Sequence, residues 1–383
     1  MHDLDAVRRA RWATAAIFLF NGMLMGTWAV HIPIVEARLA ISHSTLGAAL
    51  LVMAAGALVA MPLTGSGIAR FGSAPLTRGA AIAFLIVFPL PLIAPHPALL
   101  MAVLFLFGAA NGVLDVSMNA HGVLVERRLG RAVMSSLHGM WSLGGLIGAG
   151  LAALLLPFLP SLAEAALALA IAALLGIPAL VFLFPATDDA GGGKTAFAWP
   201  SRATLGLGVL CFLCMTSEGA MHDWSALHLA EGFERGPGFA ATGFAAFSAA
   251  MAASRFGGDW MRSRFGMVPL VRRSGYLAAA GLTLALVTPW PLLAVAGFAL
   301  VGLGLANLVP VFFGAAGRIP GQGAGTAIAA VATMGYSGFL LGPPVIGIVA
   351  DVTSLSLALG LIVVACLAIG ISAGAVRQAG GTA

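Results

Sequence analysis

The sequence predicts an all-α membrane protein of twelve spanning helices, arranged as two pseudo-symmetric halves of six. Three observations predict this class. Of the 383 residues, 60% are hydrophobic and only 9% are charged, whereas a soluble domain carries about 25% charged residues. The apolar residues form twelve long runs. Short segments of the first half return in the second half at an offset near half the chain length.

The twelve runs are interpreted as helices because a spanning helix needs about 20 mostly apolar residues. Their length and their lack of alternation exclude the strands of a membrane barrel. Proline, glycine and charged clusters separate the expected spans, which cover residues 12–35, 44–68, 76–95, 98–123, 133–157, 162–184, 203–229, 238–260, 268–288, 290–315, 323–349 and 355–376.

The internal repeat rests on three matches in the same order. They are Trp28-Ala-Val-His31 with Trp224-Ser-Ala-Leu-His228, Arg70-Phe71-Gly72 with Arg264-Phe265-Gly266, and Gly108-x-x-Asn111 with Gly304-x-x-Asn307. Matched halves in an apolar chain are typical of secondary transporters.

Residues 185–201 form the only long polar break and include three consecutive glycines, so they are predicted to be a flexible linker. We therefore expect one six-helix half at 1–184, a cytoplasmic linker at 185–201 and a second half at 202–383. Because six is even, both halves enter the membrane from the same side. They can then be related by an axis along the membrane normal, with the substrate path between them.

The basic residues predict the topology. If both termini are cytoplasmic, Arg255 falls inside the eighth span and only Arg38 and Arg235 fall outside the membrane. The other 16 of the 19 basic residues then lie on the cytoplasmic side, as the positive-inside rule requires. This bias accounts for the net charge of +5 without any nucleic-acid partner. We expect a multi-pass protein of a bacterial inner membrane whose first span is not a cleavable signal.

The sequence offers little chemistry for catalysis. Cys211-x-x-Cys214 has the spacing of a redox or metal motif, but no histidine or further cysteine stands nearby, so both are interpreted as small buried helix residues. There is no phosphate loop, metal cluster or nucleophile–base pair with a plausible third member. We expect no cofactor and no metal, and we expect a protein that is not an enzyme.

Polar residues inside the spans are the candidate binding residues, because ionisable groups at mid-bilayer cost at least about 2.5–3.5 kcal/mol. Asn111, Asp115 and Asn119 follow each other at four-residue intervals and share one helix face. A buried carboxyl group takes up a proton more readily than one in water. Asp115 is therefore the candidate for proton exchange, although the stripe is also compatible with a structural network between helices.

The seventh span carries Glu218 and His222 on one face, as candidate ligands of a substrate or proton, and Asp223 nearer the periplasmic end, as a gate candidate. Trp224 repeats Trp28 of the first span. These two aromatic rings would either stack on a substrate or anchor the packing of helices.

Further candidates lie on other spans. Asn21 shares a stripe with Trp28, and His138 and Trp141 lie on the fifth span, where His138 would either relay protons or be a satisfied buried imidazole. The remaining candidates are Asn307 and Tyr336. Arg255 and Asp259 stand four apart in the eighth span, which favours an intrahelical ion pair or gate latch over substrate binding.

Several of these segments resemble the major facilitator superfamily. The loop Gly65-x-Gly-x-x-Arg70-Phe-Gly72 and its echo Arg264-Phe-Gly266 look like the superfamily's loop motif, with Ala69 where an acidic residue is usual. Arg255-Phe-Gly-Gly258-Asp259 is similar to the fucose-permease-like branch. Asp115-Val-Ser-Met-Asn119-Ala-His121, Ser135-Ser-Leu-His138-Gly-Met-Trp141 and Glu218-Gly-Ala-Met-His222-Asp223-Trp224 resemble the bacterial YbjJ-type inner-membrane proteins. Membership implies solute transport by alternating access.

The leading hypothesis is a monomeric secondary transporter of a small polar organic solute such as a sugar, coupled to protons through Asp115 and Glu218. The alternative is a proton-driven exporter of amphipathic compounds, which a cavity rich in methionine and aromatic residues would suit. A membrane enzyme or sensor is the third and least favoured hypothesis.

Overall fold

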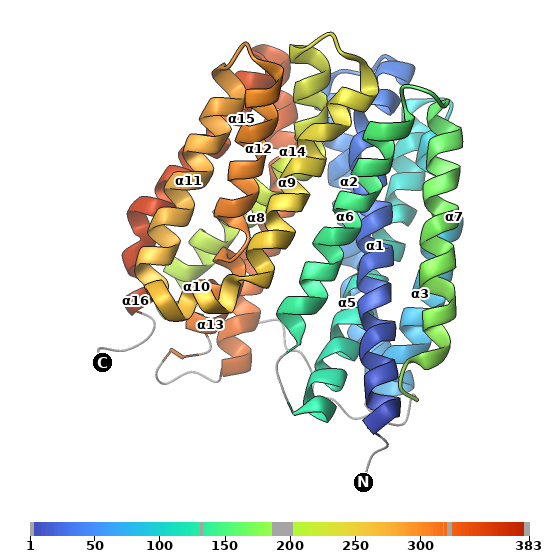
Figure 1. Ribbon diagram of the computed structural model, residues 1–383, viewed down its shortest axis with the longest axis vertical. Helices are drawn as coiled ribbons and strands as arrows, with labels where there is room; N and C mark the ends of the chain where they lie inside the picture. The colour runs from blue at the N-terminus through green and yellow to red at the C-terminus, as the bar shows by residue number, and fades with distance from the viewer. Residues whose placement is uncertain (1–3, 131–132, 186–201, 317, 320–323, 379–383) are drawn as a thin grey trace. The chain divides into compact units, whose positions relative to one another are not determined.

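The computed structural model describes residues 4–130, 133–185, 202–316, 318–319 and 324–378, and within these ranges the regular elements are all helices. Figure 1 shows the chain running from α1 at the N-terminal end to α16 at the C-terminal end. The predicted linker, 185–201, lies outside the described residues except for Pro185.

The N-terminal helices reach the predicted linker. They are α1 (Leu4–Leu39), α2 (His43–Phe71), α3 (Ser73–Val87), α4 (Leu90–Ile93), α5 (Pro97–Leu129), α6 (Met134–Leu155), α7 (Ser161–Ala179) and the 3-10 helix η1 (Leu180–Phe182). The C-terminal helices follow it. They are α8 (Arg202–Gly232), α9 (Gly236–Phe256), α10 (Gly258–Phe265), α11 (Met267–Val287), α12 (Pro291–Leu305), α13 (Leu308–Ala316), α14 (Ala324–Val352), α15 (Leu355–Ile371), η3 (Ser372–Gly374) and α16 (Ala375–Gln378).

Eleven helical segments of the described residues are long and apolar enough to cross a membrane. They correspond to eleven of the twelve predicted spans. The predicted span 238–260 is α9, a helix of 21 residues that is not among the eleven. A glycine at 257 separates α9 from α10, so the predicted span consists of two helices.

The chain divides into two compact units. One contains Met1–Ile41, Ala48–Lys194 and Arg235–Ala241, and the other contains Ser42–Gly47, Thr195–Glu234 and Thr242–Ala383. Most of each unit therefore comes from one half of the sequence, but the first turn of α2 belongs to the second unit and the start of α9 belongs to the first.

The helix pairs inside the two units follow the internal repeat. In the first unit α1 packs extensively along α6, and α3 packs on α5. In the second unit α8 packs along α14, and α11 packs on α12. Small residues allow close contact in membrane helices: an added Cβ at Gly144 would collide with the backbone oxygen of Leu19. The two halves therefore build equivalent pairs from equivalent spans.

The repeated Arg-Phe-Gly turn has the same backbone geometry in both halves. Gly72 has φ 82° and ψ 165°, and Gly266 has φ 72° and ψ 167°. A positive φ of this kind is favourable only for glycine. The turn lets α3 and α11 begin directly after the preceding helix, and it explains why glycine ends both copies of the motif.

The tenth predicted span, 290–315, consists of two helices that meet shortly before Pro310. Helix α12 ends at Leu305 and α13 begins at Leu308. A proline cannot donate to the carbonyl four residues before it, and its ring clashes with that carbonyl. The residue four before Pro310 is Ala306, whose carbonyl oxygen is therefore left for another donor.

Candidate functional site

The polar stripe of α5 lies in the first unit and meets side chains from α1 and α6. Asn21 Nδ2 donates to Asn111 Oδ1 at 2.7 Å, and Trp141 Nε1 donates to Asn21 Oδ1 at 2.7 Å. Farther along α5, Asn119 Nδ2 donates to the backbone oxygen of Asp115 at 2.8 Å and to its carboxylate Oδ1 at 3.1 Å. The structure thus brings five of the predicted residues into one polar cluster.

Asp115 has only neutral partners in this cluster. Among the contacts of the described residues, its carboxylate accepts from Asn119 and has no cation within ion-pair distance. The side chain is half-buried. His138, one turn before Ser142 on α6, is exposed and packs edge-on against Phe18 with ring centroids 5.4 Å apart.

The second unit holds a charged cluster centred on Arg255. Its Nη2 lies 3.5 Å from Glu218 Oε2, with side chains 12% and 15% exposed. Its Nε donates to the backbone oxygen of Ala306 at 3.3 Å, the carbonyl that Pro310 leaves without its helical donor. The break between α12 and α13 therefore supplies the acceptor that holds Arg255 beside Glu218.

Asn307 supports the same arrangement. Its Nδ2 donates to the backbone oxygen of Ser254 at 3.2 Å and to its hydroxyl at 2.9 Å, which ties the helix break to α9 next to Arg255. The predicted pairing of Arg255 with Asp259 stays a prediction, and the described carboxylate contact of Arg255 is with Glu218. The side chain of Asp259 lies outside the described residues.

The other predicted residues of the second unit have described contacts of their own. His222 Nδ1 lies 2.8 Å from Asp223 Oδ1, and the imidazole packs edge-on against Phe244. Tyr336 on α14 is 37% exposed. The repeated tryptophans are both buried, Trp28 against Phe107 and Trp224 in a stack with the ring of His43. Such burial favours the packing role over the stacking of a substrate.

Comparison with known proteins decides the family. A model of the Major Facilitator Superfamily matches residues 12–343. The chain belongs to this superfamily. It is 35% identical over 367 residues to an uncharacterised MFS-type transporter of Yersinia pestis, covering 96% of this chain and 95% of that protein. It is 36% identical over 356 residues to the membrane protein MosC of Rhizobium meliloti, covering 92% of this chain and 86% of that protein.

Solved structures of the superfamily have the same fold. The nucleoside transporter NupG superposes with a TM-score of 0.70 at 14% identity, covering 96% of this chain and 99% of that one. The fucose:proton symporter FucP of E. coli superposes with a TM-score of 0.62 at 15% identity, covering 97% and 98%. The chain is therefore a multi-pass membrane transporter with the twelve-helix superfamily fold, and not an enzyme.

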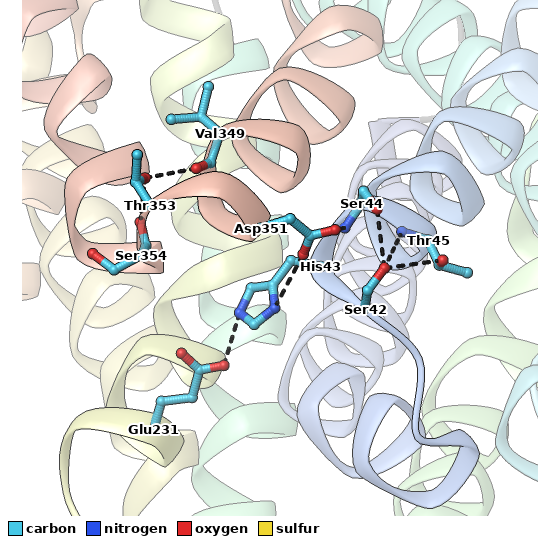
Figure 2. Close-up of polar contacts among 9 residues, drawn as sticks. All are labelled: Ser42, His43, Ser44, Thr45, Glu231, Val349, Asp351, Thr353 and Ser354. Atoms are coloured by element: carbon cyan, nitrogen blue, oxygen red, sulfur yellow. Dashed lines mark hydrogen bonds and ion pairs between the residues drawn. The ribbon is translucent and has the colours of Figure 1, made fainter.

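The transporter carries a third polar cluster, in the second unit, that sequence reasoning missed. Figure 2 shows His43, in the first turn of α2, between two carboxylates. Its Nε2 lies 2.8 Å from Glu231 Oε1 on α8, and its Nδ1 lies 3.8 Å from Asp351 Oδ1 on α14. The N–H of Ser44 donates to Asp351 Oδ2 at 3.1 Å, so this carboxylate also caps the amino end of α2.

Of the two capping contacts on α2, only the one made by Ser42 could be predicted from the local sequence. Ser42 precedes the helix and its hydroxyl accepts from the N–H of Thr45 at 3.2 Å, as an N-cap serine does. That local pattern predicts where α2 begins. The acidic partner stands 307 residues after Ser44, beyond the reach of any local pattern.

A buried pair in the first unit was missed for the same reason. His31 Nε2 lies 3.4 Å from Glu164 Oε2, and the two side chains are 1% and 0% exposed. The other ring nitrogen of His31 lies 2.8 Å from the backbone oxygen of Thr27. This pair joins α1 to α7. An acidic residue in the first turn of an otherwise apolar span was the available signal.

The remaining sulfur and metal candidates are structural. Cys211, Cys214 and Cys366 are buried free thiols. Within the described residues, no group of three or more His, Cys, Asp or Glu side chains is placed to hold a metal ion. The described contacts of the Asp115 and Glu218 side chains are hydrogen bonds and the ion pair of Glu218 with Arg255.

Proposed function

We propose that this transporter moves a small, neutral, polar solute across the bacterial inner membrane by alternating access, and that protons drive it. The observation that carries the proposal is the contrast between two carboxyl groups, one in each unit. Asp115 has only neutral partners among the described contacts, whereas Glu218 faces Arg255 at 3.5 Å.

Protonation has a different consequence at each group. A proton on Asp115 removes a charge that no described cation balances, so no ion pair is broken. A proton on Glu218 removes the negative charge that faces the guanidinium of Arg255 at 3.5 Å, which weakens this ion pair and changes the charge offered to a solute. In this proposal Asp115 takes up the driving proton, and Glu218 couples proton binding to the solute through Arg255.

Two further observations support the proposed class of solute and the proposed location in the inner membrane. The structural neighbours are a nucleoside transporter and a fucose:proton symporter, and both named solutes are rich in hydroxyl groups. The positive-inside bias supports cytoplasmic termini and an inner-membrane location. Amide and carboxylate side chains such as those of α5 suit hydroxyl groups.

Transport in proteoliposomes tests the coupling. Vesicles containing the full chain are given a pH gradient of either direction, and accumulation of labelled uridine and L-fucose is measured. We expect the native protein to concentrate one of these probes only when the gradient is present. Asp115→Asn should abolish this concentration and retain exchange between labelled and unlabelled probe.

Asp115→Glu is the matched control, since it keeps a carboxyl group at the same place and should keep part of the gradient-driven uptake. Accumulation of the probe by Asp115→Asn against its gradient would contradict the role of Asp115. Accumulation by the native protein without any pH gradient would contradict proton coupling itself.

The alternative of an amphipathic-drug exporter gains no support from the geometry. It relied on methionine and aromatic side chains lining a cavity. Met118 and Met221 beside the candidate residues are 1% and 0% exposed, and Trp28 and Trp224 are equally buried. These side chains fill helix contacts within the two units.

A further inference from the structure

The polar cluster of the first unit contains a chain of three hydrogen-bonding side chains with a fixed direction. Trp141 on α6 donates to Asn21 on α1, and Asn21 donates to Asn111 on α5, each over 2.7 Å. The residues come from three helices. Asn21, at the centre, is 1% exposed.

The direction follows from the indole group. An indole N–H can only donate, whereas an asparagine side chain has one accepting end and one donating end. Trp141 therefore requires the oxygen of Asn21, and this turns the NH₂ group of Asn21 toward Asn111. Asn111 must in turn present its oxygen. A reversed amide at Asn21 would face N–H with N–H and lose both hydrogen bonds, which is costly for a side chain that is 1% exposed.

This direction determines what Asn111 offers to a ligand. Its Oδ1 is occupied by Asn21, and among the contacts of the described residues its Nδ2 has no partner. Asn111 is half-buried, so the free end is a donor at the surface of the cluster. One turn later on the same face of α5, Asp115 offers carboxylate oxygens as acceptors.

We infer that Asn111 is a specificity residue that donates to an acceptor oxygen of a neutral polyhydroxylated solute, such as a sugar ring or a ribose. A second hydroxyl of the same ring donates to Asp115. Trp141 and Asn21 are positioning residues, since they keep the donor of Asn111 turned toward the solute. This inference rests on the proposed function and specifies which hydrogen-bonding groups of the solute the site recognises.

Methyl ethers of a bound probe test the direction of the donor, because an ether oxygen accepts a hydrogen bond but cannot donate one. The full chain in lipid nanodiscs is screened with uridine, L-fucose and myo-inositol, and then with methyl ethers of the probe that binds, one hydroxyl at a time. We expect one position at which the ether is accepted and another at which it is rejected, facing Asn111 and Asp115 respectively.

Substitution then assigns the accepted position. Asn111→Asp replaces the donor by an acceptor of the same shape. It should lower the affinity for that ether by about 10- to 100-fold and lower the affinity for the parent hydroxyl compound much less, because a hydroxyl can rotate and donate. Trp141→Phe removes the indole donor, so the side-chain amides of Asn21 and Asn111 can turn over. The variant should therefore show a smaller difference between its affinities for the methyl ether and for the parent compound. Trp12→Phe, at a side chain 63% exposed, is the matched control and should change neither affinity.

Three results would overturn the inference: no methyl ether binds the native protein, Asn111→Asp treats ether and parent alike, or none of the three neutral probes binds. Proton coupling is measured separately with Asp115→Asn. If that variant loses coupling while Asn111→Asp leaves the ether preference unchanged, the proposed function stands and this inference fails.

Discussion

Replacing Arg255 by methionine tests how the charged cluster of the second unit is held. The substitution leaves the Glu218 carboxylate and the Ala306 carbonyl without their shared donor. Breaking a fully buried ion pair costs about 3–5 kcal/mol. Here the side chains keep 12% and 15% exposure and the N–O distance of 3.5 Å is long. We therefore expect a loss of about 2–3 kcal/mol in the free energy of unfolding.

A double-mutant cycle isolates the ion pair. Glu218→Gln alone should cost about 1–2 kcal/mol, because Arg255 keeps its bond to Ala306. In the double variant Arg255→Met/Glu218→Gln neither charge of this pair remains, so its loss in the free energy of unfolding should be smaller than the sum of the two single losses by about 1–2 kcal/mol.

The assay is equilibrium unfolding of the purified full chain in detergent, followed by the fluorescence of its tryptophans. Arg235→Met is the matched control, since Arg235 is exposed and lies over the ring of Phe239. It should change stability by less than about 0.5 kcal/mol. Strict additivity of the two cluster variants would refute the reasoning, because it would mean that the two charges do not interact.

Two further predictions concern local structure. Gly72→Ala and Gly266→Ala should each lower thermal stability by about 1–2 kcal/mol, since both glycines have positive φ. Gly79→Ala, at a helical glycine with open space around it, should not lower it, and equal effects at all three sites would contradict the backbone argument. Asp351→Asn should weaken the capping of α2 by about 0.3–1 kcal/mol. Faster hydrogen exchange at Ser44 would show this, and unchanged exchange would count against the cap.

The fold could be predicted from the sequence because its main signals are local. Each run of apolar residues predicts its own helix, and eleven of the twelve predicted spans correspond to described helical segments long and apolar enough to cross a membrane. The repeated Arg-Phe-Gly motif indicated equivalent turns, and Gly72 and Gly266 have nearly the same φ and ψ. The span 238–260 was predicted as one helix and is two, since glycine at 257 separates α9 from α10.

For the candidate site, the sequence could predict which residues share one face of a helix, but not which residues of other helices they contact. The stripe of Asn111, Asp115 and Asn119 follows from four-residue spacing along α5. The partners of such residues depend on which helices pack together, and no short-range pattern contains that information. For this reason the sequence did not connect Arg255 with Glu218 or with the carbonyl of Ala306, which stand 37 and 51 residues away along the chain.

The repeat also concealed a difference between the halves. Asn111 and Asn307 occupy matching positions, yet Asn111 lies inside a continuous helix and bonds to Asn21, whereas Asn307 lies at a break and bonds to Ser254. Pro310 causes that break, and the first half has Leu114 at the matching position. One proline therefore gives the two matching asparagines different partners, a side chain on another helix for Asn111 and the helix next to Arg255 for Asn307.

The cap on α2 has a consequence for how the chain is made. Ser44 and Asp351 are 307 residues apart, and ribosomes add about 5–20 residues per second. Helix α2 therefore enters the membrane roughly 15–60 seconds before its acidic cap exists. During that interval the local cap by Ser42 can form, whereas the contact with Asp351 cannot. The amino end of the second helix thus reaches its final contacts only after almost the whole protein has been synthesised, which makes it a late step of assembly.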